Sequence, residues 1–135
     1  MRRLVYGMNV SLDGFITAPG DDHDWSAPSD ELFRWWLEAE RAVTLFLSGR
    51  RLWETMHAYW PTGDQVPGAS ADEIAFAVNW RETPKVVFSS TLTAVEGNAR
   101  LHPGDAVAEI ARLKGGEGGR MRVGGVVLTR YGTVR

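Results

Sequence analysis

Short apolar segments alternate with amphipathic segments along this chain, and no other feature constrains its fold as strongly. Four apolar segments have the length of buried strands: 4–10, 43–47, 85–90 and 120–123. Between them, apolar residues recur every three or four positions, as they do in helices that cover one face of a sheet. The order β-α-β-α-α-β-α-β predicts a single α/β domain over residues 1–135 with a mainly parallel central sheet.

Capping residues mark where several of the helices begin and end. Ser29 is a candidate N-cap, 70–73 reads as a capping box, and Asp105 opens a helix that the glycine-rich run 115–119 ends. Four further segments are assigned from their patterns: a helix over 50–59, a loop over 60–69, a strand or a loop within 91–101, and the start of a helix over 126–130.

Composition excludes several classes of function. The chain has a net charge of −2 and no basic face, so nucleic acid is not expected as its main partner. It contains no cysteine, which excludes disulfides and thiolate metal sites and is compatible with a reducing cytoplasm. No apolar run approaches the length that spans a membrane. The acid-rich segment 18–24 includes His23, but its spacing fits no known metal site, so we expect a solvated loop and no metal.

The segment 43–56 has the pattern of a strand that turns at a glycine into a helix. Gly49 would let the backbone come close to a ligand, and Arg50 and Arg51 add positive charge to the first helical turn. The first backbone N–H groups of a helix have no partner inside it, so such a place suits a phosphate. Taken alone, the segment is explained more simply as an ordinary strand–turn–helix with a solvated arginine pair.

Related chemistry follows two further strands. The three strand ends of interest are 48–51, with two arginines, 89–91, with three hydroxyls, and the glycine pair 124–125. The carboxyl ends of parallel strands meet at one edge of the sheet, where α/β proteins bind ligands. Together the three ends predict a nucleotide or dinucleotide site, although neither the Rossmann fingerprint nor the P-loop is present.

Four motifs stand in order along nearly the whole chain: Gly7-Met-Asn-Val-Ser-Leu-Asp-Gly-Phe-Ile16, Ser48-Gly-Arg-Arg-Leu-Trp-Glu54, Lys85-Val-Val-Phe-Ser-Ser90 and Val123-Gly-Gly125. In this order they resemble the dihydrofolate reductase superfamily. The resemblance is closest to the branch that contains the reductase domain of the bifunctional riboflavin-biosynthesis deaminase–reductase. It implies a three-layer, dihydrofolate-reductase-like α/β domain that binds NADPH and transfers hydride to a heterocyclic small molecule.

The resemblance also implies which residues hold the cofactor. Arg50 and the serines that end the next strand would bind the adenosine 2′-phosphate, since a guanidinium and hydroxyls suit a phosphate dianion. The loop over about 11–16 would cover the nicotinamide. Leu52 stands where many family members have a hydroxyl residue that touches phosphate, so one contact is expected to be missing. The implied cofactor-binding set is Ser11, Gly49, Arg50, Arg51, Leu52, Ser89, Ser90, Gly124, Gly125 and Val126.

Two aspartates are candidates for a catalytic proton donor. By the resemblance, Asp30 lies nearest to the acid that serves the pterin in dihydrofolate reductase. An acid in the first turn of a helix is, however, explained more simply by the helix dipole. Asp13 either faces the substrate pocket or shapes the Asp-Gly turn. The sequence therefore assigns the role to neither residue.

The family pattern continues past the glycine pair with a helix and further strands, whereas ten residues follow Gly125 here. We therefore expect C-terminal strands to be missing, which would expose apolar surface and reduce stability or favour self-association, for example as a homodimer. Two alternatives to an active NADPH-dependent reductase stay open. One is a non-catalytic NADP(H)-binding module that has lost its substrate side, and the other is a structural α/β domain without a ligand.

Overall fold

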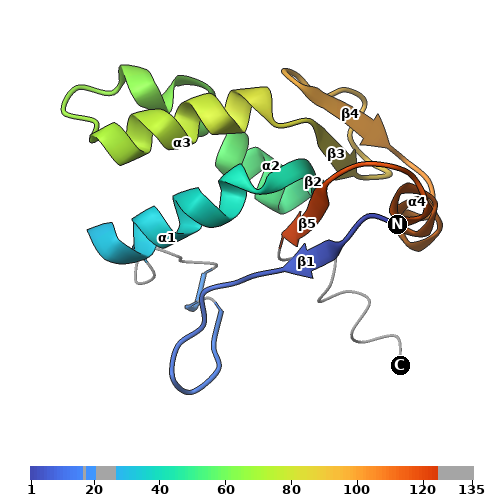
Figure 1. Ribbon diagram of the computed structural model, residues 1–135, viewed down its shortest axis with the longest axis horizontal. Coiled ribbons are helices and arrows are strands. Elements are labelled where there is room, and N and C mark those ends of the chain that lie inside the picture. The colour runs from blue at the N-terminus through green and yellow to red at the C-terminus, as the bar shows by residue number, and fades with distance from the viewer. Residues whose placement is uncertain (17, 21–26, 125–135) are drawn as a thin grey trace.

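The computed structural model describes residues 1–16, 18–20 and 27–124. Figure 1 shows the elements in chain order. They are β1 (Leu4–Tyr6), α1 (Asp30–Arg41), β2 (Val43–Gly49), α2 (Arg50–His57), the 3-10 helix η2 (Trp60–Gln65), α3 (Ala71–Glu82), β3 (Lys85–Phe88), β4 (Ala99–His102), α4 (Ala106–Gly115) and β5 (Arg120–Gly124).

The five strands form one parallel sheet in the order β1-β5-β2-β3-β4. Leu47 in the central strand β2 lies opposite Val86 of β3 on one side and Val123 of β5 on the other. The prediction of an α/β domain with a parallel sheet is therefore confirmed. Because all strands run the same way, their carboxyl ends lie along one edge, which we call the carboxyl edge.

Helices cover both faces of the sheet, which gives three layers. In Figure 1, α4 lies on the right of the strands, and α1 and α3 lie on the left. Successive side chains of a strand point to opposite faces, so each face has its own apolar cluster. Leu47 and Val123 pack in the cluster on the α4 side, and Phe46 and Val87 pack on the other face with Trp53.

The helices begin where the capping pattern predicts. Ser29 Oγ accepts a hydrogen bond from the backbone N–H of Leu32 at 3.3 Å. Ser70 and Glu73 form both hydrogen bonds of a capping box, at 3.1 and 2.7 Å. The carboxylate of Asp105 accepts from the first turn of α4. Each cap satisfies N–H groups that the helix itself cannot, which fixes the residue at which it starts.

Several predicted segments differ in extent from the observed ones. The first strand ends at Tyr6 and not at residue 10, because the carbonyl oxygen of Gly7 accepts from the Arg122 side chain and not from a neighbouring strand. Gly7 also packs closely on Trp36: a Cβ at position 7 would lie 3.1 Å from the indole ring. The predicted loop 60–69 contains a 3-10 helix, which has a proline in its first turn. The other revisions are that α2 ends at His57, β3 ends at Phe88, and 91–101 contributes the short strand Ala99–His102. The predicted helix start at 126–130 lies outside the described residues.

Candidate functional site

The centre of the carboxyl edge is formed by the end of β2 and the start of α2. Gly49 is the last residue of β2 and the N-cap of α2, with an extended backbone (φ −80°, ψ 174°). It has no side chain to cap the helix, and the first turn of α2 contains no acidic residue. The unpaired N–H groups and the helix dipole therefore present uncompensated positive potential at this edge.

The structure brings Arg50 and Ser89 together from neighbouring strand ends, since Gly49 lies opposite Phe88 in the β2–β3 register. Arg50 Nη1 donates to Thr91 Oγ1 at 3.0 Å, and Thr91 Oγ1 lies 3.2 Å from Ser89 Oγ. We call Arg50, Ser89 and Thr91 the edge cluster. Sequence reasoning counted Thr91 among the hydroxyls of this strand end but did not include it in the cofactor-binding set. Its hydroxyl is what links the arginine to the serine.

The edge cluster is held in place before any ligand binds. Ser89 Oγ accepts hydrogen bonds from the backbone N–H groups of Thr91 and Leu92, at 3.2 and 3.1 Å, which shapes the turn after β3. Arg50 Nε donates to Glu54 Oε1 one helical turn further on, at 2.8 Å. The side chain of Arg50 is 47% exposed, so solvent still reaches the guanidinium. Ser90 and Arg51 are exposed beside the cluster.

The glycine at the end of β5 is covered by a side chain from α2. A Cβ at Gly124 would lie 2.1 Å from Leu52 Cδ2 and 3.1 Å from Phe46 Cζ. Leu52 thus packs over Gly124, so the small size of residue 124 is required by packing. Whether its backbone also meets a cofactor stays a prediction. Gly125 and Val126, the other residues predicted here, lie outside the described part of the chain.

The two candidate acids lie in separate places. Asp13 is exposed and belongs to a closed turn: Ser11 Oγ donates to Asp13 Oδ1 at 2.6 Å and accepts from the backbone N–H of Phe15 at 2.9 Å. Asp30 is exposed in the first turn of α1. The observed geometry gives Asp13 a turn-forming contact and Asp30 a favourable place in the helix dipole. A catalytic role for either stays a prediction.

Sequence reasoning missed a charged residue in the middle of β5 whose side chain is only 16% exposed. Arg122 forms an ion pair with Glu40 of α1 and donates to the carbonyl oxygen of Gly7 at 3.3 Å. Its Cζ atom lies 4.5 Å from the centre of the Trp36 ring. Burial lowers the pKa of Arg122 to about 10, so the side chain stays charged at neutral pH. The one signal in the sequence was the second arginine of the strand pattern Arg-Met-Arg-Val, which does not indicate a partner.

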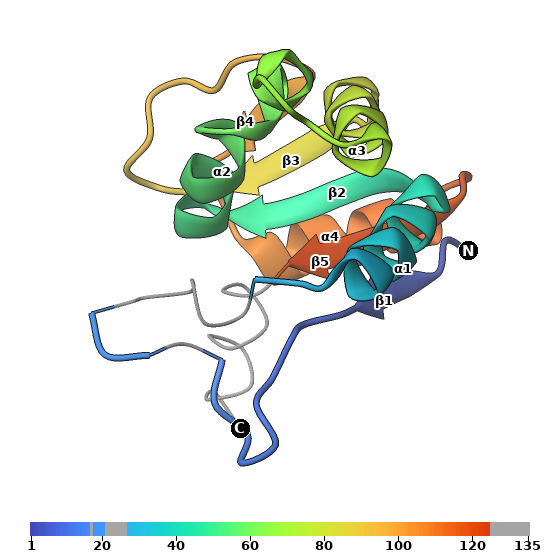
Figure 2. The same cartoon turned by 90° about the vertical axis from the view of Figure 1, so that its left-hand side faces the viewer.

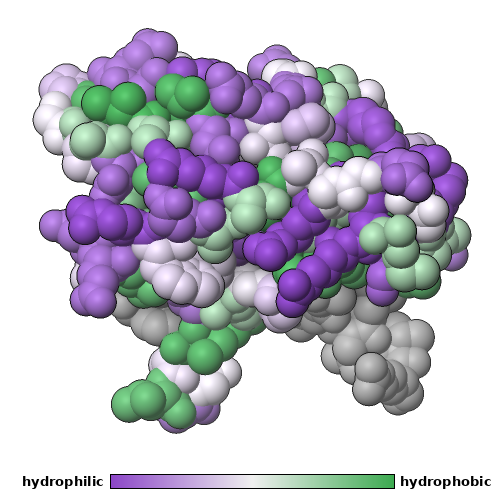
Figure 3. Space-filling view, viewed as in Figure 1, coloured by the Kyte–Doolittle hydropathy of each residue, from purple (hydrophilic) through white to green (hydrophobic). Residues whose placement is uncertain are grey.

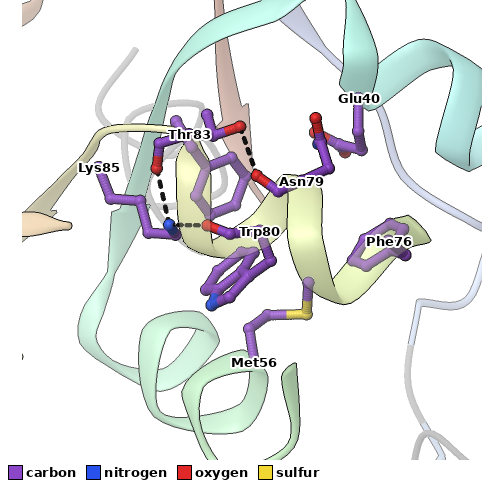
Figure 4. Close-up of a pocket in the computed structure, with 8 residues that line it drawn as sticks. Glu40, Met56, Phe76, Asn79, Trp80, Thr83 and Lys85 are labelled. Atoms are coloured by element: carbon purple, nitrogen blue, oxygen red, sulfur yellow. Dashed lines mark hydrogen bonds between the residues drawn. The ribbon is translucent and has the colours of Figure 1, made fainter. Parts of the chain in front are cut away.

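A second buried cation lines a small pocket between α1, α3 and the sheet (Figure 4). Lys85 Nζ donates to the carbonyl oxygens of Trp80 and Thr83, the latter at 2.7 Å, and lies 4.5 Å from the centre of the Trp80 ring. Burial lowers the pKa of Lys85 to about 8. Because the ammonium group is held by carbonyl oxygens at the C-terminal end of α3, it caps that helix.

The fold and this edge define a parallel α/β domain with a place suited to a phosphate between its central strands. Residues 2–125 match the RibD C-terminal domain family, and the chain belongs to that family. It is a family of oxidoreductase domains of the riboflavin pathway, with the dihydrofolate-reductase-like fold that the sequence motifs predicted. No curated protein matches the chain. In the described part of the chain, no helix has the length and apolar character needed to cross a membrane.

Proposed function

We propose that this chain is an NADPH-dependent reductase that binds the cofactor along the carboxyl edge and reduces a heterocyclic small molecule, as in riboflavin biosynthesis. The observation that carries the proposal is the edge cluster. A guanidinium, two hydroxyls and the start of a helix converge there from two neighbouring strands. That donor set fits a phosphate dianion.

The edge cluster also leads us to expect a preference for NADPH over NADH. The 2′-phosphate is the group that distinguishes the two cofactors, and Arg50 is the cationic member of the cluster. Glu54 holds Nε of Arg50 and Thr91 holds Nη1, so the guanidinium is oriented in advance. Orienting a side chain before binding reduces the entropy lost when the ligand arrives.

The bound cofactor would supply the hydride, and the protein would bind, orient and exclude water. For the proton that must accompany the hydride, Asp13 and Asp30 remain the candidates. Both carboxylates are exposed, and this favours a second candidate function: a non-catalytic NADP(H)-binding module. Turnover of a pyrimidine or pterin substrate distinguishes the two, because only the reductase would oxidise NADPH.

A thermal melt with excess NADPH or NADH tests the proposal. At about 100 times its dissociation constant, a ligand adds about 2.7 kcal/mol to the free energy of unfolding. We expect a larger shift of the melting temperature with NADPH than with NADH. Equal shifts, or none in a chain that melts cooperatively, would refute the 2′-phosphate site.

The Arg50→Ala variant tests the residue that carries the proposal. Losing charge-assisted hydrogen bonds to the phosphate should weaken NADPH binding about 10- to 150-fold. Arg41→Ala is the matched control. Arg41 is 51% exposed and pairs with a glutamate on its own helix, but lies at the end of α1 remote from the edge cluster. If both variants respond to NADPH as the original chain does, Arg50 does not bind the cofactor.

A further inference from the structure

The segment that leaves β1 reaches the carboxyl edge beside the glycine end of β5. Tyr6 lies opposite Val123, so Gly7 leaves the sheet at the level of Gly124. Three hydrogen bonds involve this segment: Arg122 Nη2 to the Gly7 carbonyl oxygen at 3.3 Å, Tyr6 Oη to Met8 Sδ at 3.3 Å, and Trp36 Nε1 to Asn9 Oδ1 at 2.9 Å. Two of their donors belong to elements distant in sequence, β5 and α1.

These two donors are themselves fixed. Arg122 is clamped between its ion pair with Glu40 and the face of the Trp36 ring. The Trp36 ring also packs against the backbone of Gly7, where a Cβ would come within 3.1 Å. We call Arg122, Trp36 and Glu40 the anchor. It holds both ends of the segment 7–9 to the same face of the sheet.

Stability alone is a weak reason for this arrangement. Burying an ion pair costs desolvation energy, so apolar residues of similar size are often as stable or more stable. The Arg122 and Glu40 side chains are only 16% and 11% exposed, and Arg122 Nε is buried without a hydrogen-bond partner in the described structure. The arrangement does, however, fix the position of a main-chain segment that has left the sheet and has no strand partner.

The anchored segment leads into a turn that exposes apolar side chains. Two residues after Asn9, the closed Ser11–Phe15 turn described above begins, and its own hydrogen bonds fix its shape. Leu12 and Phe15 are exposed there. Figure 3 shows apolar surface on the part of the molecule that projects downward, which is this loop in Figure 1.

The anchored segment and the edge cluster lie at different parts of the carboxyl edge. The strand order separates β1 from β3 by three strand spacings, about 14 Å. An extended ligand whose phosphate sits at β2 and β3 can continue past the glycine end of β5 toward β1. On the other side, the end of β4 carries His102, which packs against Phe88 at 5.6 Å between ring centres.

We propose that Trp36 and Arg122 are positioning residues that hold the segment 7–9 in contact with the half of the dinucleotide distant from the 2′-phosphate. This inference rests on the proposed NADPH binding. It makes a specific prediction: loosening the anchor weakens binding of the whole dinucleotide and leaves binding of its phosphorylated adenosine half unchanged.

The test compares NADPH with adenosine 2′,5′-bisphosphate by isothermal titration calorimetry on the full chain. Trp36→Phe removes the indole N–H that binds Asn9, and the outer part of the ring that packs against Gly7, and keeps an aromatic ring on the side of Arg122. Losing one hydrogen bond should weaken NADPH binding about two- to tenfold. The affinity for the bisphosphate should stay the same. Trp35→Phe is the matched control: Trp35 is 60% exposed, and phenylalanine keeps an aromatic ring beside Trp36, whose ring centre lies 4.9 Å from that of Trp35.

Asn9→Ala removes the other partner of the same hydrogen bond, and provides the test if Trp36→Phe does not fold. Both variants should weaken NADPH binding to a similar extent, and the double variant should bind no more weakly than either. Amide hydrogen exchange of residues 8–15 gives a readout without cofactor. It should be faster in Trp36→Phe than in Trp35→Phe.

The results separate the two proposals. If the original chain binds neither NADPH nor the bisphosphate, the proposed function is wrong. If it binds both, and Trp36→Phe weakens neither or weakens both equally, NADPH binding stands and the positioning role is overturned. Unchanged hydrogen exchange over residues 8–15 in Trp36→Phe would also overturn it.

Discussion

Replacing Gly124 by alanine tests the packing between α2 and β5 directly. The added Cβ would lie 2.1 Å from Leu52 Cδ2 and 3.1 Å from Phe46 Cζ, well inside the roughly 3.5–4.0 Å at which carbon atoms pack. The backbone of Gly124 is not in the left-handed region, so alanine can adopt its conformation. The main obstacle is therefore the Leu52 side chain, which has to move by more than an ångström, whereas Phe46 has to move by only a few tenths of an ångström.

The size of the effect follows from what Leu52 loses when it moves. Leu52 is half-buried and packs against the cluster that contains Phe46 and Trp53. A forced change of rotamer and lost packing cost about 1–3 kcal/mol in an already filled core. Alanine offsets part of this, since it reduces the freedom of the unfolded chain relative to glycine by about 0.4–1 kcal/mol. We expect Gly124→Ala to lower the free energy of unfolding by about 1–2 kcal/mol.

Urea denaturation of a double-mutant cycle with Leu52→Ala checks this reasoning. Leu52→Ala alone should cost about 1–2 kcal/mol, below the range for a fully buried leucine. The double variant should be about as stable as Leu52→Ala, because the obstructing atoms are gone. Gly115→Ala is the control, since no atom lies within 4 Å of a Cβ built at that position. If the losses of stability in the two single variants simply add in the double variant, Leu52 is not the side chain that prevents a larger residue at position 124.

Two further predictions concern pH. Burial lowers the pKa of Lys85 from 10.5 to about 8, so the unfolded chain binds this proton more tightly than the folded chain does. Between pH 8 and 10.5, the free energy of unfolding measured in urea should therefore rise relative to that of a Lys85→Met variant. A difference between the two that does not change with pH would contradict this. Hydrogen bonds from Arg112 and Arg100 lower the pKa of Glu109 from 4.5 to about 2; its stabilising contribution should be complete above pH 4.5 and be lost towards pH 2. The advantage over Glu109→Gln should therefore shrink as the solution is acidified, and a constant difference would show that the two ion pairs contribute nothing.

Local patterns in the sequence were enough to predict most of the elements. A helix cap depends only on residues within one turn of each other, so Ser70 and Glu73 predict the start of α3 without any knowledge of the rest of the fold. The extent of β1 was predicted wrongly because the partners of Gly7, the Arg122 side chain and the Trp36 ring, are distant in sequence. The strand Ala99–His102 was left open for a similar reason. It is only four residues long, half-buried at the sheet edge, and defined by pairing with β3.

The candidate site likewise has one part that local sequence patterns predict and one part that depends on contacts distant in sequence. The edge cluster could be predicted because each of its members follows directly after an apolar strand, and parallel strands bring such residues to one edge. The anchor could not, because nothing near Arg122 in sequence indicates that it meets Glu40 and the carbonyl of Gly7. An isolated arginine in a strand is most simply interpreted as an exposed residue.

The edge cluster and the anchor depend on different strand pairings, so they can form at different stages of folding. The hydrogen bond between Arg50 and Thr91 spans 41 residues and depends on the pairing of β2 with β3. The one between Arg122 and Gly7 spans 115 residues. It also requires β5 to insert between β1 and β2, since β5 is the only strand that pairs with β1 in the described sheet. Loop closure over a longer segment costs more entropy, so the edge cluster can form in a chain whose β1 is still detached, whereas the anchor cannot. For the proposed NADPH binding, a perturbation of β5 should therefore impair binding of the whole dinucleotide before it impairs binding of the phosphorylated adenosine half.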